Sequence, residues 1–151
     1  MPDELTFMMG QFPARIPADR QYVATHFWLM EREPGLYRVG FTAYAVRLLQ
    51  DVYFLDWSIS DGAVVAKKQE IGEIESSKAL STMHAAETGE IVRLNPIVAA
   101  DPSAINADSY GEGWLYDLRT SADLLTPAQY LEVLAASWDK TQALIKGQMN
   151  Q

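Results

Sequence analysis

The 151-residue sequence contains no cysteine. It therefore forms no disulfide, binds no metal through thiolates and offers no cysteine nucleophile. Histidine is nearly absent as well: His26 and His84 lie far apart and lack the spacing of a zinc motif, so His26 is interpreted as structural. A Gly-x-Ser-x-Gly nucleophile motif is missing too. These absences leave no basis for predicting a metal site or a hydrolase triad.

Basic residues are scarce relative to acidic ones. The 12 lysines and arginines against 20 acidic residues give a formal net charge of −8, with no basic cluster in the sequence. Such a chain repels a phosphate backbone, so no nucleic acid partner is expected. Long apolar runs are also absent, which predicts no membrane insertion. Met1–Asp19 lacks the basic-then-apolar order of a secretory signal, so a cytoplasmic location is expected, with a processed organellar protein as the alternative.

The residues that are present have the composition of a globular protein. Hydrophobic residues make up 48 % and charged residues 21 %, and the length favours one domain with a sizeable core. Turn signals such as Asp61-Gly62, read as a hairpin turn, and Thr88-Gly89 separate short runs rich in strand-forming residues. These runs are Tyr22–Met30, Leu36–Phe41, Asp51–Ile59, Val64-Val65, Ile91–Leu94 and Trp114–Arg119. The pattern predicts a mainly β fold.

Helix signals are short until the end of the chain. Thr42 is expected to cap a helix that reaches about Leu49, and Asn95-Pro96 and Asp101-Pro102 predict short helical turns. The capping box Thr126-Pro127-Ala128-Gln129 predicts a helix to about Lys146 that stops at Gly147. The apolar stripe of this helix comprises Leu131, Leu134, Trp138, Thr141 and Ile145. Core packing of the stripe is the favoured interpretation, and a docking surface is the alternative.

The stretch Ile71–Ser81 predicts a β-hairpin. Apolar and polar residues alternate up to Glu75, the alternation breaks at Ser76-Ser77-Lys78, and it resumes through Ala79–Met83. Serine hydroxyls suit the bend because they can bond nearby backbone groups. Lys78 is expected at the tip, where spacing alone would make it an ordinary surface lysine.

Four stretches of the sequence resemble the glycine cleavage system H protein. Glu75-Ser76-Ser77-Lys78-Ala79 is similar to the lipoyl-attachment hairpin of that family, Glu-Ser-Val-Lys-Ala. In the same order along the chain, His26-Phe27-Trp28 is similar to His-Glu-Trp, and Val39-Gly40-Phe41-Thr42 to Val-Gly-Ile-Thr. Tyr110-Gly111-Glu112-Gly113-Trp114 is similar to the Tyr-Gly-Glu-Gly-Trp-like segment of the family. The resemblance covers about Tyr22 to Tyr130.

This resemblance implies a lipoyl/biotinyl-type barrel-sandwich hybrid, mainly β, with short helices and a C-terminal α-helix. Residues 1–21 would form an extended N-terminal arm, 22–120 the lipoyl-type β domain, and 121–151 a C-terminal helix packed on it. Lipoic acid would be attached covalently to Lys78, and the lipoylating enzyme would recognise Glu75. The chain would be a carrier without a catalytic site of its own, and a cysteine-free scaffold cannot trap its own arm in a mixed disulfide.

The role of a lipoyl carrier implies several partner enzymes. They are a lipoate ligase or other lipoylating enzymes, dihydrolipoamide dehydrogenase, and the enzymes that load and unload the arm. Phe27 departs from the family, in which the glutamate at this place helps to hold an aminomethyl-bearing arm. Phenylalanine cannot accept a hydrogen bond from an amine. Phe27 and His84, which follows Met83 on the strand leaving Lys78, are candidate arm contacts.

Phe27, the long N-terminal arm and the extended C-terminal helix resemble the H-like lipoate-binding proteins of heterodisulfide-reductase-like sulfur oxidation. On this interpretation the arm carries sulfur intermediates and the partner is the heterodisulfide-reductase-like complex. The alternative is the H protein of the glycine cleavage system, which carries the aminomethyl group between the glycine cleavage enzymes. An unlipoylated interaction module and a small enzyme using surface carboxylates also stay open.

Overall fold

The computed structural model describes the backbone of residues 4–149 and the side chains of residues 4–140. The first strands along the chain are β1 (Leu5–Met9), β2 (Phe12–Ile16), β3 (Gln21–Val23), β4 (Phe27–Glu33) and β5 (Leu36–Phe41). They are followed by β6 (Val52–Trp57), β7 (Ala63–Val65), β8 (Glu70–Ser76), β9 (Leu80–His84), β10 (Gly89–Leu94) and β11 (Tyr116–Arg119). The helices are α1 (Ala43–Leu49), α2 (Pro96–Ala100), α3 (Ala104–Ala107) and α4 (Pro127–Met149). The fold is mainly β with short helices and a C-terminal helix, as expected.

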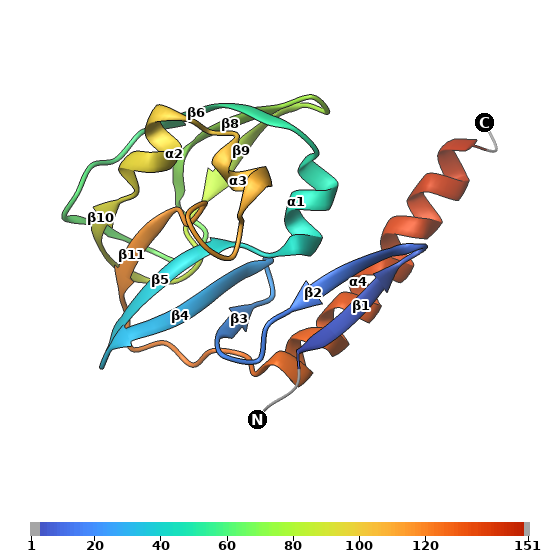
Figure 1. Ribbon diagram of the computed structural model, residues 1–151, viewed down its shortest axis with the longest axis horizontal. Coiled ribbons are helices and arrows are strands. Elements are labelled where there is room, and N and C mark those ends of the chain that lie inside the picture. The colour runs from blue at the N-terminus through green and yellow to red at the C-terminus, as the bar shows by residue number, and fades with distance from the viewer. Residues whose placement is uncertain (1–3, 150–151) are drawn as a thin grey trace.

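Two sheets enclose the main core. The larger sheet has the order β3-β4-β5-β11-β10-β7, and the smaller one has the order β6-β8-β9 (Figure 1). Alternate side chains of both sheets point between them, among them Leu29, Val39 and Leu118 from the larger sheet and Ile71 and Ile74 from the smaller. This is the barrel-sandwich arrangement.

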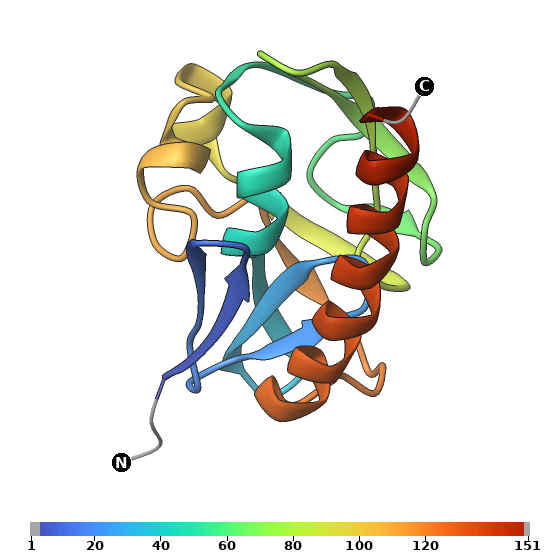
Figure 2. The same ribbon diagram turned by 90° about the vertical axis from the view of Figure 1, so that its right-hand side faces the viewer.

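A second core lies on the outer face of the larger sheet. Tyr22 and Trp28 of that face are buried against elements from both ends of the chain, namely β1, β2 and α4, together with α1. Figure 2 shows the β1–β2 hairpin and α4 flanking α1 on one side of the molecule. In the middle of this core Tyr22 and Tyr130 stack with ring centroids 4.7 Å apart. The two ends of the chain therefore complete one layer of packing.

The N-terminal segment is a hairpin and not the expected extended arm. Met9 pairs with Phe12, and Gly10 between them has a φ of 63°, a conformation that glycine adopts without strain. Pro13 is tolerated because a two-stranded ribbon has only edge strands, where a missing backbone donor is not needed. The three prolines concealed this turn signal in the sequence. The predicted boundaries at residues 22 and 121 stay predictions.

Three further expectations differ from the structure. Tyr22–Met30 is not one strand, because the chain turns between β3 and β4 at His26, which has a φ of 75°. Asp61-Gly62 is not a hairpin turn, since β6 before it and β7 after it belong to different sheets. Finally, α4 continues through Gly147 to Met149. An interior glycine weakens a helix by about 1 kcal/mol and does not necessarily end it.

The remaining helix signals are local and mostly agree. Thr42 caps α1, Asn95 caps α2, and the Thr126–Gln129 capping box is formed in both directions. Asp101 instead ends α2, and its carboxylate accepts hydrogen bonds from Ser103 before α3. The side chains of Thr141 and Ile145 lie outside the described part of the stripe. Of the helices described, none combines the length and apolar character needed to span a bilayer.

Candidate functional site

Lys78 lies at the tip of the β8–β9 hairpin. Glu73 pairs with Thr82, Ile74 with Ser81 and Glu75 with Leu80, so the strands stay in register up to the turn. Ile74 points into the core and Lys78 is exposed. Ile71, three residues before Ile74, is buried as well, because a register shift between Glu70 and Gly72 interrupts the alternation. The amine of Lys78 is thus available to another protein.

Hydrogen bonds brace the tip. The Ser76 amide donates to the Ala79 carbonyl at 3.0 Å, and the Ser76 hydroxyl accepts from the Lys78 amide at 3.3 Å. Ser77 ties the tip to the start of β6: its amide donates to the Asp51 carbonyl at 2.8 Å, and its hydroxyl accepts from the Asp51 amide at 3.2 Å. Lys78 therefore lies on a turn that is braced by hydrogen bonds.

An apolar rim surrounds this tip. It consists of Tyr53, Phe54 and Leu80, which are 59 %, 43 % and 61 % exposed. Phe54, Glu75 and Leu80 face one another directly across β6, β8 and β9. Desolvation and then the nearby charge of Glu75 raise the pKa of the Tyr53 hydroxyl. A carboxylate and exposed apolar groups thus lie together beside Lys78.

An apolar pocket of about 490 Å³, here called the arm pocket, lies between the small sheet and α1. Its lining comprises Thr25, His26, Phe27, Phe41, Ala45, Leu48, Leu49, Lys68, Ile74, Ser81, Thr82, Met83 and His84. Phe27 is buried and stacks on Phe41 with ring centroids 5.2 Å apart. Among these described lining residues there is no aspartate or glutamate. The wall suits an alkyl chain better than a cation.

His26 belongs to the arm pocket and also to a buried polar chain. Its Nδ1 lies 2.9 Å from the Tyr130 hydroxyl, which lies 2.8 Å from the Thr42 hydroxyl that caps α1. Burial lowers the pKa of the His26 imidazole to about 4, so the ring is neutral at pH 7. This chain connects the first turn of α4 with the pocket wall.

The structure brings together Phe27 of β4 and His84 of β9, which line the arm pocket from different sheets. Lys78 and Glu75 lie at the hairpin tip and are not in the lining, although Ser81 and Thr82 of β9 connect the two regions. The contributions of Leu48, Leu49 and Lys68 to the pocket were missed from the sequence. No local sequence pattern predicts their role, because only the tertiary fold brings them close to β9.

A barrel-sandwich with an exposed lysine at the tip of a braced hairpin is the arrangement expected of a carrier domain of the lipoyl or biotinyl class. The glycine cleavage H-protein family model matches residues 20–140. A glycine cleavage system H protein of Mycolicibacterium smegmatis is 40 % identical over 76 % of this chain and 87 % of its own length. One from Psychrobacter cryohalolentis is 40 % identical over 78 % of this chain and 96 % of its own.

A solved structure gives the same result. The crystal structure of a glycine cleavage system H protein from Mycobacterium marinum matches with a TM-score of 0.66 and 37 % identity, over 76 % of this chain and 95 % of that one. The chain therefore belongs to the glycine cleavage H-protein family. Proteins of this family are lipoyl carriers without catalytic activity of their own, and lipoate is attached covalently to one of their lysines.

Proposed function

We propose that Lys78 is the lipoylated lysine and that the protein acts as the H protein of a glycine cleavage system. The observation that carries the proposal is the exposed amine of Lys78 on a braced turn, three residues after Glu75. Lipoate bound in this way would place a dithiol on a flexible arm. Tethering raises the concentration of the carried aminomethyl group at each partner enzyme.

The surroundings of Lys78 supply a contact surface for the lipoylating enzyme. Any enzyme that acylates the Lys78 amine has to contact the hairpin tip, and the apolar rim of Tyr53, Phe54 and Leu80 is continuous with it. Exposed apolar groups of this kind favour association when a partner covers them. Glu75 adds one charge of defined position, which favours the correct lysine over others.

The arm pocket supplies a resting place for a loaded arm. Its apolar lining from β4, β9 and α1 would bury alkyl carbons and shield the cargo from water. Phe27 provides no carboxylate to the cargo amine, so a cationic group would rely on Thr25, Ser81 and Thr82 at the polar parts of the wall. Retention of the aminomethyl group is accordingly expected to be weaker than with an acid in this wall.

The relatives favour the glycine role over the sulfur role expected from the sequence. Both extensions that suggested a sulfur carrier take part in the second core, which gives them a structural reason. Phe27 alone still favours sulfur cargo, because an uncharged sulfur group needs no acid. Carriage of sulfur to a heterodisulfide-reductase-like complex is therefore the second candidate, and dihydrolipoamide dehydrogenase is a proposed partner in either case.

The first test is the site of modification. After co-expression with a lipoate ligase, peptide mapping by mass should find the lipoyl group on Lys78. Lys78→Arg should stay folded and carry none, while the matched control Lys68→Arg in the pocket wall should be fully lipoylated. A lipoyl group on Lys67, Lys68, Lys140 or Lys146 would contradict the proposal.

The second test is the cargo. Lipoylated protein incubated with glycine decarboxylase, glycine and pyridoxal phosphate should gain the mass of an aminomethyl group. Phe27→Glu should lengthen retention of that group by about tenfold or more, because a charge-assisted hydrogen bond contributes about 1.5–3 kcal/mol. Phe27→Leu, which keeps the wall apolar, serves as the control. If a persulfide donor transferred sulfur to the lipoyl arm and the glycine system transferred no aminomethyl group, sulfur would be the cargo and the glycine role would be wrong.

A further inference from the structure

A row of side chains crosses the outer face of the larger sheet, away from Lys78. Met30 pairs with Arg38, Arg38 with Asp117, and Asp117 with Arg93, so these side chains of β4, β5, β11 and β10 share one face. The face is the outer one, since the neighbours of Asp117 along β11, Tyr116 and Leu118, point into the main core. The second core covers the part of this face around Tyr22 and Trp28, and its edge reaches the row at Met30 and Trp114.

Trp114 lies between two arginines of the row. The Arg38 guanidinium is 3.9 Å and the Arg93 guanidinium 5.3 Å from the centroid of its ring. Such stacking fixes the plane of a guanidinium and leaves its N–H edge free to bind an anion. Trp114 is 4 % exposed, so it provides a fixed support for both.

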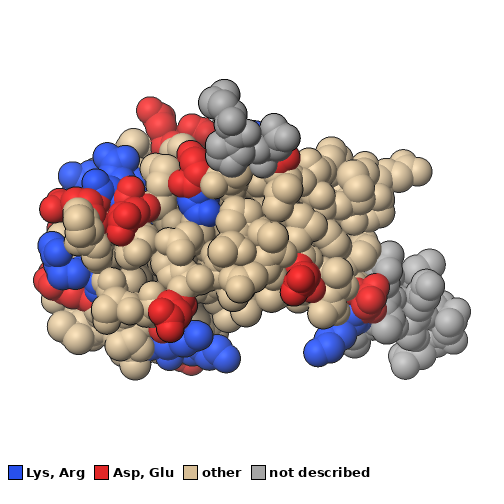
Figure 3. Space-filling model, turned by 90° about the horizontal axis from the view of Figure 1, so that it is seen from below, with Lys and Arg blue, Asp and Glu red and all other residues tan. Residues whose placement is uncertain are grey.

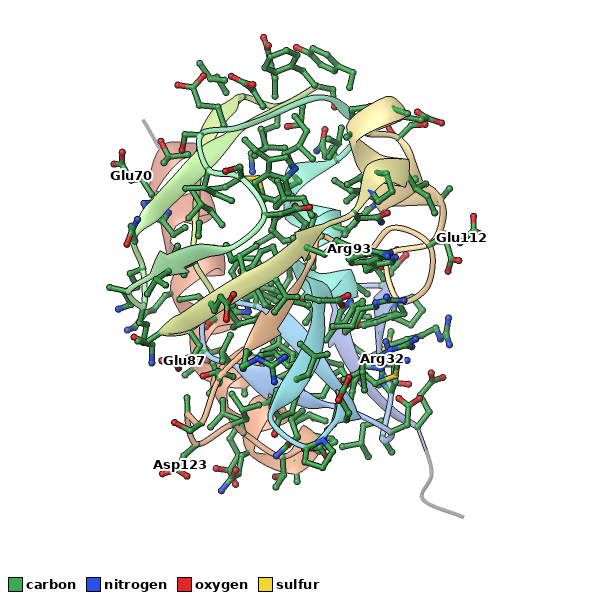
Figure 4. The ribbon with its side chains drawn as sticks, turned by 90° about the vertical axis from the view of Figure 1, so that its left-hand side faces the viewer. Arg32, Glu70, Glu87, Arg93, Glu112 and Asp123 are labelled. Atoms are coloured by element: carbon green, nitrogen blue, oxygen red, sulfur yellow. The ribbon has the colours of Figure 1, made fainter. Side chains whose placement is uncertain are left out.

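The arginines differ in their electrostatic partners. Arg38 donates hydrogen bonds to both carboxylate oxygens of Asp117, at 3.0 and 3.4 Å. Arg93 and Arg32 are exposed and form no ion pair with any residue whose side chain the structure describes. Figure 4 shows them on the same side of the molecule, with Glu112 projecting outward at the rim. Two guanidinium groups are therefore available on one face.

These residues enclose a second pocket of about 480 Å³, here called the arginine pocket. Its lining includes Arg32, Arg38, Arg93, Trp28, Trp114, Met30, Ile97, Asp108, Tyr110 and Glu112. The Asp108 carboxylate is engaged by the Glu112 amide at 3.0 Å. Arginine, methionine and aromatic residues are enriched in protein interfaces, and Ile97 is 41 % exposed at the edge. The composition suits a protein segment better than a small ion.

The acidic net charge of the chain restricts which anionic partners the arginine pocket could bind. The whole chain carries −8, and Figure 3 shows acidic and basic side chains interspersed at the end of the molecule away from α4. A long polyanion would be repelled by the acidic groups around the arginines. A short segment that presents one or two carboxylates next to an apolar side chain would meet the guanidinium edges and Ile97 without that repulsion.

We propose that the arginine pocket binds an acidic segment of a partner protein, with Arg93 and Arg32 donating to its carboxylates. The site is separate from Lys78 and from the arm pocket, so a partner held here leaves the arm free to work. The inference does not depend on which cargo the arm carries. The sequence did not show this site, because its arginines come from three different strands.

The test is a titration of ¹⁵N-labelled protein with the capped peptide acetyl-Leu-Glu-Glu-Leu-Glu-amide. Amide shifts should be confined to β4, β5, β10 and residues 108–114, and the Trp114 indole signal should move. The double variant Arg32→Gln/Arg93→Gln should bind at least about tenfold more weakly. Its control, Arg47→Gln/Lys140→Gln, removes the same charge elsewhere and should bind like the parent protein. Both variants should keep the melting temperature of the parent within a few degrees.

Several outcomes would overturn the proposal. They are equal binding of the peptide with glutamine in place of glutamate, shifts centred on Lys78, and no shifts at millimolar peptide. If inorganic phosphate produced the same shifts at the same concentration, the arginine pocket would be a site for small anions. The proposal of an acidic partner segment would then be wrong. Equal loss of binding in the two double variants would show that only net charge matters.

Discussion

His26 combines a left-handed backbone conformation with a largely buried ring. Its φ of 75° makes the turn between β3 and β4, and its Nδ1 is held by Tyr130. Asparagine also tolerates a left-handed conformation, whereas most residues would be strained there. The histidine is thus a structural residue, as expected, and in addition forms part of the pocket wall.

The neutral state of His26 predicts a pH-dependent stability. Its folded pKa of about 4 lies below the usual 6.5, so the unfolded chain binds a proton in the intervening range and the folded chain does not. The stability contribution is fully present above pH 6.5 and is lost as pH falls towards 4, by about 2 kcal/mol between pH 7.5 and 5. Urea unfolding at the two pH values should show this loss.

A matched pair of variants isolates the histidine from the carboxylates that titrate in the same range. His26→Asn should lower the free energy of unfolding at pH 7.5 and should lose that part of the pH dependence. His84→Asn, at an exposed histidine, should retain it. An identical pH dependence in His26→Asn and the parent protein would contradict the assignment.

At the level of elements, the part of α4 whose side chains are described packs against the second core through its first turns. Tyr130 and Leu134 are fully buried in the second core, while Leu131 and Trp138 are partly buried. Trp138 contacts the Tyr44 ring edge-on at 6.4 Å. The capping box of Thr126 and Gln129 fixes the helix start. The favoured core-packing interpretation of the apolar stripe fits the part of α4 whose side chains are described.

Truncation of the stripe should therefore be most severe at Leu134. Leu134→Ala is expected to lower the free energy of unfolding by about 2–5 kcal/mol, because it leaves a cavity in a closed core. Trp138→Ala should cost less than the roughly 3–5 kcal/mol expected for a fully buried tryptophan. Urea unfolding measures both, with exposed Glu132→Ala as the control. An unchanged value for Leu134→Ala would mean that α4 does not pack in solution as described.

The elements predicted correctly are those whose signals lie within a few residues. The β8–β9 hairpin, the Thr42 cap and the Thr126–Gln129 capping box each depend on residues close together in sequence. The His26–Tyr130 contact and the arginine row join residues far apart, so no local pattern announces them. The N-terminal hairpin was missed because prolines outweighed a single glycine turn signal at Gly10.

At the scale of the whole molecule, the two cores stabilise different parts of the structure. The main core between the two sheets supports the hairpin tip, and the second core holds β1, β2 and α4 on the outer face. The polar chain of His26, Tyr130 and Thr42 is where the second core reaches the arm pocket. The hydrogen bonds of the turn itself join residues 76–79 to one another and to Asp51.

Deletion of residues 1–16 tests this division. The truncated protein should melt about 5–10 °C lower, because it loses the buried side chains of Met9, Ala14 and Ile16 from the second core. It should still be lipoylated at the rate of the full chain, measured by intact mass after ligase treatment. A folded truncated protein that is lipoylated much more slowly would show that the N-terminal hairpin contributes to recognition.

The tie between Ser77 and Asp51 has a consequence for movement. Because Ser77 is hydrogen-bonded to Asp51, directly before β6, a group attached to Lys78 would move about a point braced against the body, and its reach would be set by the rotatable bonds of the side chain and of the group. The swept volume is then a cap centred on the hairpin, with a fixed position relative to the rest of the body. A partner that binds the folded domain in one orientation would therefore meet the carried group within the same volume each time. Loss of the Ser77 hydroxyl hydrogen bond to Asp51, as in Ser77→Gly, would let the turn move and would enlarge this volume.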